Sequence, residues 1–458
     1  MAFKDLREFL DYLKERRDLF VVDREVSTEY EIAAFSRKTS DLDGPALLFT
    51  NVKGYEMPVL GGLYGARRRI VQALGLNEDN LLQEYIKKEK QLLEPKLVAD
   101  GPVKEVVWKG DDIDLFKLPI ITNFEKDAGP YITGGIQIAR DPVSGARNCS
   151  MHRMLLLDRN HLTVYAPMGR QLGIIISRYE DNDQPTEIAT AIGVEPATAI
   201  ASQCRPPLGT DEMYIAGGMR GEPVELVKCE TIDVEVPATA EIVIEGRTIP
   251  HRRADDGPFG EYPGTYSWVR QAPVLEVTAI TMRQKPIYQN VLTGMPMTEN
   301  HWMMDLAATA IAYQEAYKIC PDIKDIRMTP GGTSRHHLVV SIKKRHEYEP
   351  RNIITALLAA NIGAKLVIVV DEDIDIYNPL EVEWAVNTRV QAERDVIILP
   401  TMYSPTLDPS APAPRSSSKM GIDATAPLGK REEYARVYTP GQDEPYITEM
   451  LMNYMKGN

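Results

Sequence analysis

The stretch Lys365-Leu-Val-Ile-Val-Val370 is an apolar, mostly β-branched run that ends at Asp371, and it determines the predicted fold class. Its length and composition are typical of a buried strand. Similar runs and intervening helical segments surround it, at 337–342, 352–361, 379–390 and 395–399. Apolar strands that alternate with helices indicate a parallel sheet covered on both faces. The C-terminal third is therefore predicted to be an α/β domain.

The patterns upstream of this domain divide the rest of the chain into two parts. The first hundred residues alternate between helix and strand, with elements expected at 4–16, 19–22, 29–38 and 46–50. From about 103 to 300, alternating runs are separated by turn clusters such as Asp141-Pro-Val-Ser-Gly145. We expect this middle region to be antiparallel and barrel-like, with one helical interruption at about 184–203.

Composition limits the class of protein. A chain of 458 residues with 43% hydrophobic residues has room for two or three domains, each with its own core. A net charge of −14 argues against a nucleic-acid-binding protein, which would carry a basic surface. The four cysteines form no CxxC pair, which suits a reducing compartment. No apolar run is long enough to span a membrane. We therefore predict a soluble, cytoplasmic protein that binds no nucleic acid and no membrane.

The densest group of chemically active side chains lies in the stretch from Arg252 to Tyr266, which includes Asp255, Asp256 and Glu261. Glycines and prolines stand between these carboxylates and allow tight turns and close approach of the backbone to a ligand. The alternative interpretation is a solvated loop between two strands. Composition alone leaves both interpretations open.

A second polar group follows the Asp-Pro-Val-Ser-Gly turn, in Ala146-Arg-Asn-Cys-Ser-Met-His-Arg153. Arg147, Asn148, Ser150 and Arg153 are side chains suited to binding an anion. On a strand, Ser150 and His152 would share one face, with Met151 and Arg153 on the other. A solvated strand face is the alternative.

Together these segments resemble the UbiD family of prenylated-FMN decarboxylases, over nearly the whole chain. The resemblance rests on five motifs in one order: Asn148 to Arg153, Glu212-Met-Tyr-Ile-Ala-Gly-Gly-Met-Arg-Gly221, Val236 to Gly246, Asp256-Gly-Pro-Phe-Gly-Glu261, and Ser418 to Thr425. It implies a reversible non-oxidative decarboxylase for an aromatic, heteroaromatic or α,β-unsaturated acid.

The resemblance also implies the architecture. The family has a central split β-barrel related to flavin reductases, between an N-terminal α/β region and a C-terminal α/β domain. Mapped onto this chain, these parts are residues 1–105, 106–305 and 306–458. Family members associate through the C-terminal part, so we expect a homodimer or a higher homo-oligomer.

By the same resemblance, Arg153, Asp256 and Glu261 are the catalytic residues. An arginine pairs with the substrate carboxylate and favours ionisation of neighbouring acids. Two adjacent acids cannot both ionise freely, so one of them keeps a proton. Decarboxylation requires a proton for the carbon that CO2 leaves. We assign the role of proton donor to Glu261, and we expect Asp256 to adjust the ionisation of these two acids.

The cofactor residues also follow from the resemblance. Those expected at prenylated FMN are Asn148, Ser150, Met151, Arg153, Gln171 and Glu212. Of these, Asn148, Gln171 and Glu212 would hold a divalent metal, manganese or magnesium, on the flavin phosphate, and K+ is a further candidate ion. Relatives usually have histidine where Gln171 stands, and an amide oxygen is a weaker ligand than imidazole for manganese. A separate flavin prenyltransferase would supply the cofactor.

Four further residues are candidates for contact with the substrate: His301, Arg335, His336 and His337. A structural role is the alternative for each histidine. They favour a heteroaromatic or dicarboxylic acid as the substrate. Residues 404–418 are expected to form either a lid near the cofactor or a plain mobile loop.

Three further interpretations stay open. Asp371, Glu372 and Asp373 are expected to cap a helix or bind a ligand, and the helix from Trp302 to Tyr317 to lie in the core or an interface. Two rival functions are a flavin-dependent oxidoreductase on the same barrel and a non-catalytic flavin-binding relative. Neither needs the intact trio of Arg153, Asp256 and Glu261.

Overall fold

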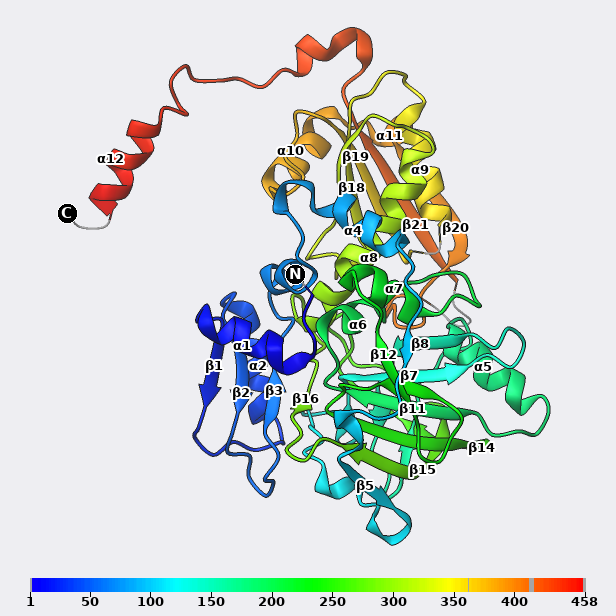
Figure 1. The fold of residues 1–458 in the computed structure, drawn as a ribbon. Coiled ribbons are helices and arrows are strands. Elements are labelled where there is room, and N and C mark those ends of the chain that lie inside the picture. The colour runs from blue at the N-terminus through cyan, green and yellow to red at the C-terminus, as the bar shows by residue number, and fades with distance from the viewer. Residues whose placement is uncertain (1, 361, 412–415, 456–458) are drawn as a thin grey trace.

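In the computed structural model, which describes residues 2–360, 362–411 and 416–455, the N-terminal part is a four-stranded sheet with helices beside it (Figure 1). The strand order is β1 (Leu19–Val22), β2 (Ala46–Phe49), β3 (Val59–Gly61) and β16 (Tyr288–Gln289). The helices are α1 (Leu6–Glu15), α2 (Glu31–Asp41), α3 (Arg67–Leu74) and α4 (Leu81–Lys90). In α1 the apolar residues at i, i+3, i+4 and i+7 are all buried, as the sequence predicts.

The middle part is built on a seven-stranded antiparallel sheet. The order is β10 (His161–Thr163), β15 (Arg270–Met282), β14 (Ile242–Asp256), β11 (Glu187–Ile192), β7 (Gly135–Arg140) and β8 (Arg147–Met151), and β5 (Val106–Lys109) also pairs with β15. Smaller units are β13 (Glu235–Pro237), β12 (Glu225–Lys228) and β4 (Lys96–Leu97) in one sheet, and β6 (Tyr131–Ile132) with β9 (Met154–Leu155) in another. The predicted antiparallel character of this region is confirmed.

The helical interruption predicted at 184–203 is confirmed only in its second half. Residues Glu187–Ile192 form strand β11 in the middle of the sheet, and only α6 (Pro196–Ala201) is helical there. Two further helices of this part are α5 (Gln171–Glu180) and α7 (Glu212–Arg220). Alanine and glutamate favour a helix, but β11 is hydrogen-bonded on both sides, to β14 and β7, and all but its first residue are buried. Tertiary packing therefore overrides local propensity.

The expected split barrel is not confirmed. Among the described residues the sheet runs from β10 at one end to β8 at the other, and these two strands do not pair with each other. The architecture is accordingly one of mixed α/β parts with an open central sheet. The division at 1–105, 106–305 and 306–458 stays a prediction.

The C-terminal part is a five-stranded sheet with helices on both faces. Its order is β17 (Ile323–Met328), β18 (His337–Ile342), β19 (Leu366–Asp371), β21 (Ser416–Ala424) and β20 (Val396–Tyr403). The helices are α9 (Glu349–Ala359), α10 (Pro379–Arg389), α11 (Ala392–Asp395), α12 (Pro445–Met455) and, leading into this part, α8 (Glu299–Tyr317). The α/β prediction and its first two parallel strands are confirmed.

The third strand of that prediction is placed differently. β20 lies at the edge of the sheet and is antiparallel to β21, which takes the parallel position beside β19. β21 begins at the end of the Pro/Ser-rich stretch at 401–418, where the serines gave no strand signal, so the sequence did not predict this strand. Residues 412–415 of that stretch, and Asn361 at the end of the predicted helix 352–361, lie outside the described residues.

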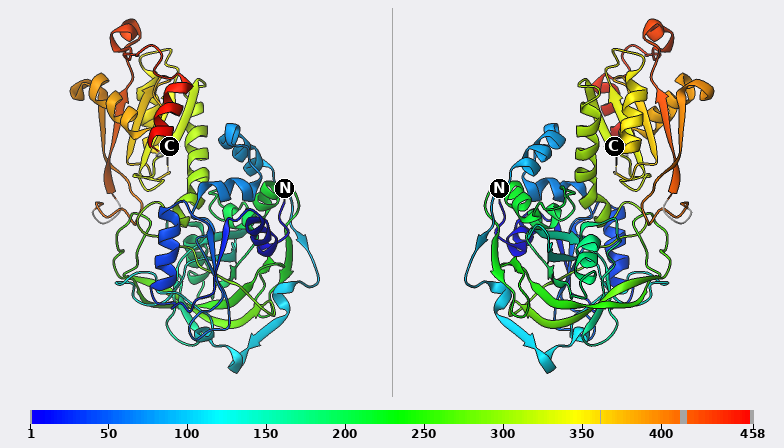
Figure 2. Two further views of the ribbon diagram at one scale, coloured as in Figure 1. Left: turned by 90° about the vertical axis from the view of Figure 1, so that its left-hand side faces the viewer. Right: turned by 90° about the vertical axis from the view of Figure 1, so that its right-hand side faces the viewer.

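Helix α8 connects the parts, and Figure 2 shows it upright beside the C-terminal sheet with its lower end at the other parts. Helix α12 ends an extended segment that leads away from the body, and none of its residues is buried (Figure 1). Within residues 2–360, 362–411 and 416–455, no helix has both the length and the apolar character needed to cross a membrane.

Candidate active site

Arg153 joins two acids in the interior of the middle part. It follows β8, whereas Asp256 is the last residue of β14 and Glu261 stands five residues later. Arg153 Nε donates to Asp256 Oδ1 at 2.9 Å, and Arg153 Nη1 contacts Glu261 Oε1. Arg153 and Glu261 are each 7% exposed, and Asp256 is fully buried. The structure therefore brings the three predicted catalytic side chains into direct contact.

Thr163 completes the hydrogen bonding of Asp256. Its hydroxyl donates to Asp256 Oδ2 at 2.6 Å and accepts from the backbone N–H of Leu155 at 3.0 Å. Thr163 is fully buried at the end of β10. With one oxygen held by Arg153 and the other by Thr163, the Asp256 carboxylate has a fixed orientation.

Three aromatic rings surround the Arg153 guanidinium. Its Cζ lies 4.0 Å from the centre of the Tyr165 ring, 5.0 Å from that of Phe259 and 6.0 Å from that of Tyr131. These distances are within the range of cation–π attraction. The rings also exclude water, so charges in this site interact through a medium of low polarity.

The loop that carries Glu261 is fixed by its backbone. Gly257 has a φ of +106°, and its N–H donates to Tyr131 Oη at 3.0 Å. A Cβ on Gly260 would lie 2.2 Å from the Phe124 ring, so only glycine fits there. The Gly260 N–H donates to Asp127 at 2.9 Å, and burial raises the pKa of Asp127 to about 6. The glycines of this motif therefore serve close packing.

A second cluster unites the three predicted metal ligands. Asn148 Nδ2 donates to Gln171 Oε1 and to Glu212 Oε1, each at 3.1 Å. Glu212 Oε2 accepts from the Cys149 N–H at 2.7 Å, and Ser150 Oγ donates to Asn148 Oδ1 at 3.0 Å. Gln171 Nε2 donates to a backbone carbonyl at 2.6 Å, so the Gln171 side-chain oxygen points toward Asn148.

The protonation of Glu212 bears on whether this cluster suits a cation. Burial raises the pKa of Glu212 to about 8, although the Cys149 N–H donates to it. Rotation of the Asn148 amide would present three oxygen atoms to one point, and oxygen ligands suit a hard divalent cation. The residues therefore fit such an ion. Among the described residues, no group of three His, Cys, Asp or Glu side chains forms a metal site, and Asn148 and Gln171 fall outside those four types.

Arginines lie next to this cluster. Arg170 precedes Gln171 at the start of α5. Burial, together with the Arg170 guanidinium, lowers the pKa of Arg205 to about 9, and burial and the same guanidinium lower the pKa of His152 to about 4. Cations beside a potential metal site suit a ligand such as a phosphate.

Three of the four predicted substrate residues gather around Tyr262, which directly follows Glu261. His336 Nε2 and Tyr262 Oη are 3.3 Å apart, and Arg335 Cζ lies 5.3 Å from the Tyr262 ring centre. His301 Nε2 donates to the Tyr262 carbonyl at 2.7 Å, and its Nδ1 accepts from the Thr298 N–H at the start of α8. Both ring nitrogens of His301 are thus bonded within the protein.

The remaining predicted residues lie to the side. His337, the first residue of β18, pairs through Nδ1 with Thr329 Oγ1 at 3.0 Å and not with Tyr262. Met151, the last residue of β8, is half-buried opposite Ile136. Asp371 and Asp373 both pair with Arg389, so they hold α10 to the sheet.

The described part of the predicted lid touches both sides of the site. Arg270 Nη2 donates to the Thr406 carbonyl at 2.7 Å, and Tyr165 Oη lies 3.4 Å from Thr406 Oγ1. Two residues later, Asp408 pairs with Lys365 of the C-terminal part at 2.8 Å. Sequence reasoning missed Thr163, Tyr165 and Arg270, because single residues on strands or in connecting segments carry no local signal.

Comparison with known proteins matches the chain to three domains of 3-octaprenyl-4-hydroxybenzoate carboxy-lyase, the UbiD family. The N-terminal domain matches residues 10–89, the Rift-related domain 96–296 and the C-terminal domain 301–424. An anhydromevalonate phosphate decarboxylase of Methanothermobacter thermautotrophicus is 35% identical over 435 residues, which is 94% of this chain and 99% of that protein.

Solved structures agree with these matches. The UbiD-class enzyme HmfF from Pelotomaculum thermopropionicum, in complex with FMN, has a TM-score of 0.90 and 43% identity, covering 97% of this chain and 99% of that one. The vanillic acid decarboxylase of Sedimentibacter hydroxybenzoicus, in closed form, has a TM-score of 0.86 and 30% identity, with full coverage of both chains.

Proposed function

Because the chain belongs to the UbiD family of carboxy-lyases, we propose that its site performs reversible, non-oxidative decarboxylation with prenylated FMN as cofactor. The substrate is an aromatic, heteroaromatic or α,β-unsaturated carboxylic acid. The observation that carries the proposal is the buried contact of Arg153 with both Asp256 and Glu261.

The charges of this trio assign the roles. One guanidinium faces two carboxyl groups in a site from which water is excluded, so one of the acids retains a proton. Asp256 is held as an acceptor by Arg153 and Thr163, which leaves Glu261 as the acid that carries the proton. As the bond to CO2 breaks, the substrate carbon keeps the electron pair and takes this proton. In carboxylation, Glu261 removes it again.

The cofactor is proposed to bind at the second cluster. Asn148, Gln171 and Glu212 would hold manganese or magnesium against the flavin phosphate, with Ser150, Met151 and Arg153 nearer the flavin and K+ as a further ion. When bound, prenylated FMN supplies the electron sink for the reaction. The raised pKa of Glu212 and the neighbouring Arg170 support this placement.

A heteroaromatic monocarboxylic or dicarboxylic acid is the proposed substrate class within the family's range. Arg335 and His336 lie at Tyr262, next to the proton donor, and offer a cation and a hydrogen-bonding ring to a second polar group. His301 is proposed to act indirectly by holding the Tyr262 backbone, and His337 stays a more remote candidate.

The proposal also covers the oligomeric state of the protein and the source of its cofactor. We expect a homodimer or a higher homo-oligomer, because α12 exposes a row of apolar residues whose burial a second copy would provide; these include Met450, Leu451 and Met455. We further propose a flavin prenyltransferase as supplier of the cofactor, a cytoplasmic location, and a split-barrel relationship for the central sheet.

The test is a matched pair of substitutions in protein co-expressed with a prenyltransferase. Glu261→Gln keeps the shape but removes the proton, and kcat for CO2 release should fall roughly 10²–10⁴-fold. Glu180→Gln is the control, since Glu180 is also buried and pairs with an arginine, Arg253, at 2.6 Å. It should stay within a few-fold of the unaltered protein. Equal losses in both variants would refute the role of Glu261, and equal activity without the prenyltransferase would refute the cofactor.

A further inference from the structure

A cavity of about 320 Å³ lies beside helix α5, at the Tyr165 ring that also contacts Arg153. Its walls come from α5, the segment 165–168 and the paired strands β14 and β15. No residue of the catalytic trio or of the Asn148 cluster lines it. Its volume is at the lower end of the range of about 300–1,000 Å³ found for pockets that bind small molecules.

The ionised side chains in the lining leave one positive charge. They are one carboxylate and two guanidinium groups, from Glu180, Arg253 and Arg270. Glu180 and Arg253 pair at 2.6 Å, so their charges cancel. Asp255 lies outside the lining and is exposed, so water and salt screen its charge. The charge that remains in the wall is that of Arg270.

Arg270 is half-buried and forms no ion pair with residues 2–360, 362–411 and 416–455. One of its nitrogens, Nη2, donates to the Thr406 carbonyl at 2.7 Å, and this bond fixes the position of the side chain. A guanidinium carries five N–H donors in a planar fork that matches a carboxylate. Arg270 is therefore held at the cavity with donors left for an anion.

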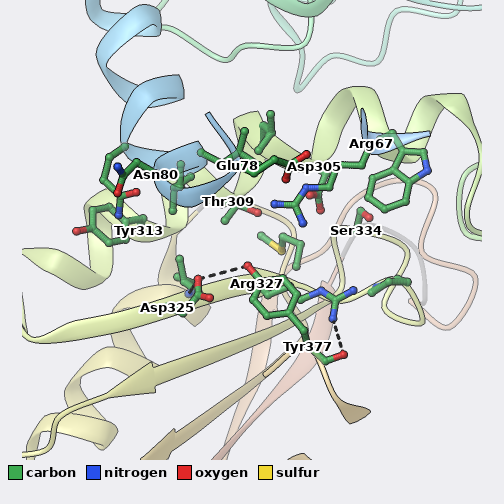
Figure 3. Close-up of a pocket in the computed structure, with 18 of the residues that line it drawn as sticks. Arg67, Glu78, Asn80, Asp305, Thr309, Tyr313, Asp325, Arg327, Ser334 and Tyr377 are labelled. Atoms are coloured by element: carbon green, nitrogen blue, oxygen red, sulfur yellow. Dashed lines mark hydrogen bonds between the residues drawn. The ribbon is translucent and has the colours of Figure 1, made fainter. Parts of the chain in front are cut away.

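A cavity between α3, α8 and β17 differs in its charges (Figure 3). Its lining combines four carboxylates with three cations, namely Glu78, Asp79, Asp305, Asp325, Arg67, Lys324 and Arg327. That cavity gives an anion no advantage. The positive balance at α5 therefore distinguishes the cavity at Arg270.

Most of the other side chains in the α5 cavity are apolar. They include Ala166, Pro167, Ile176, Ala272 and Pro273. A wall of this kind beside a single cation suits a ligand with an apolar body and one negative group. Inorganic phosphate would leave the apolar wall uncovered, whereas an aromatic acid would cover it with its ring.

We propose that this cavity is an entry site, which binds the carboxylate of an aromatic acid at Arg270 and its ring against the apolar wall. Its role in entry rests on the proposed function, but the binding itself does not. The Tyr165 ring centre lies 4.0 Å from Arg153 Cζ and 5.9 Å from Arg270 Cζ. An acid at Arg270 is therefore one aromatic ring away from the guanidinium that takes it during the reaction.

The fluorescence of Trp268 reports on Arg270 without any turnover. Trp268 is 55% exposed, and its ring centre lies 5.6 Å from Arg270 Cζ. Benzoate is the probe, and benzamide is its neutral analogue of the same shape. Both are titrated into the full chain, with Trp268→Phe as the blank for the signal and calorimetry for the stoichiometry.

A variant that fills the cavity separates this site from Arg153, which is another guanidinium that benzoate could reach. Ser177 lines the cavity from α5, and Ser177→Met adds volume there while every charge stays in place. Methionine also favours a helix. The binding that belongs to the cavity is the part that Ser177→Met removes.

We expect benzoate to bind the unaltered protein at least ten-fold more tightly than benzamide. Arg270→Gln and Ser177→Met should each weaken benzoate binding at least ten-fold, and Arg270→Lys should recover part of the loss because it keeps the charge. Arg252→Gln is the matched control, since Arg252 is exposed on β14 and does not line the cavity. Unchanged benzoate affinity in Arg270→Gln or in Ser177→Met overturns the proposal, and so does benzamide that binds as tightly as benzoate.

Turnover separates the entry site from the proposed function. In cofactor-loaded protein, Arg270→Gln should lower kcat/KM for CO2 release at least ten-fold. Release of CO2 with an unchanged kcat/KM in this variant overturns the role in entry alone. No release of CO2 by the unaltered protein refutes the proposed function, and the benzoate titration then still decides whether the cavity binds an aromatic acid.

Discussion

The hydroxyl of Thr163 supports the proposed catalytic trio of Arg153, Asp256 and Glu261, and its contribution can be measured. It donates to Asp256 Oδ2 at 2.6 Å and accepts from Leu155 N–H at 3.0 Å, all within the interior. Thr163→Val removes both bonds and keeps the shape. A hydrogen bond to a charged group contributes about 1.5–3 kcal/mol, and an orphaned buried N–H costs about 1–3 kcal/mol. We therefore expect a loss of about 3 kcal/mol in the free energy of unfolding.

Activity should fall as well, for a separate reason. Without Thr163, Asp256 is held on one side only and can turn away from Arg153. A loss of about 1.4 kcal/mol in transition-state stabilisation lowers kcat ten-fold, so a fall of roughly ten-fold or more is expected. Thr163→Ser keeps the hydroxyl and should restore most of the activity, which a purely steric defect would not allow.

Thr248→Val is the matched control. Thr248 is buried in β14, and its hydroxyl accepts from the Thr186 N–H at 2.8 Å, away from the trio. This variant should lose about 1–2 kcal/mol of stability and keep its kcat. Urea unfolding and CO2 release, measured at a temperature where all variants are folded, separate the two effects. Thr163→Val with unaltered kcat, or with a loss of stability below about 0.5 kcal/mol, would refute the reasoning.

Three further outcomes follow from the buried charges. Metal binding to the cluster of Asn148, Gln171 and Glu212 should release about one proton per ion near pH 6.5, because the pKa of Glu212 is about 8 and a carboxyl group has to ionise to bind a metal. Calorimetry in two buffers measures the number of protons released, and a value near zero would contradict this prediction. The metal-free protein should lose stability as the pH rises from about 6.5 to about 8, since in that window the folded state holds a proton on Glu212 that the unfolded state has released, and a Tm series flat over this window would count against it. Arg389→Met should cost about 3–5 kcal/mol in urea unfolding, because buried Asp371 loses an ion-pair partner 2.8 Å away, whereas a cost below about 1 kcal/mol would show that Asp371 does not need it.

The sequence predicted correctly those elements whose apolar residues form one clear pattern. Helix α1 has a single apolar face, and strand β19 is an uninterrupted apolar run, so both follow from hydrophobic pattern alone. Strands β11 and β21 contain alanine, threonine, serine and glycine, whose local preferences are weak or point elsewhere. Their place in a sheet depends on neighbours that lie far away in the sequence.

The candidate site divides in the same way. Asn148, Arg153 and Glu212 were identified because each stands in a motif that resembles the UbiD family. The supporting residues Thr163 and Tyr165 were missed, since an isolated threonine on a strand, or a tyrosine just after one, is common everywhere. Thr163 meets Asp256 only through the pairing of β10, β15 and β14, 93 residues along the chain.

The charge balance of the trio connects fold and proposed chemistry. In the free protein, Arg153 neutralises one carboxylate, and Asp256 is the acid with a second fixed donor, Thr163. In the proposed mechanism, an incoming substrate carboxylate brings another negative charge to Arg153, which would favour the protonated form of Glu261. When CO2 leaves, the electron pair would stay on the substrate carbon, which would take the proton from Glu261. The proposed acid would therefore stay protonated until the step that consumes its proton.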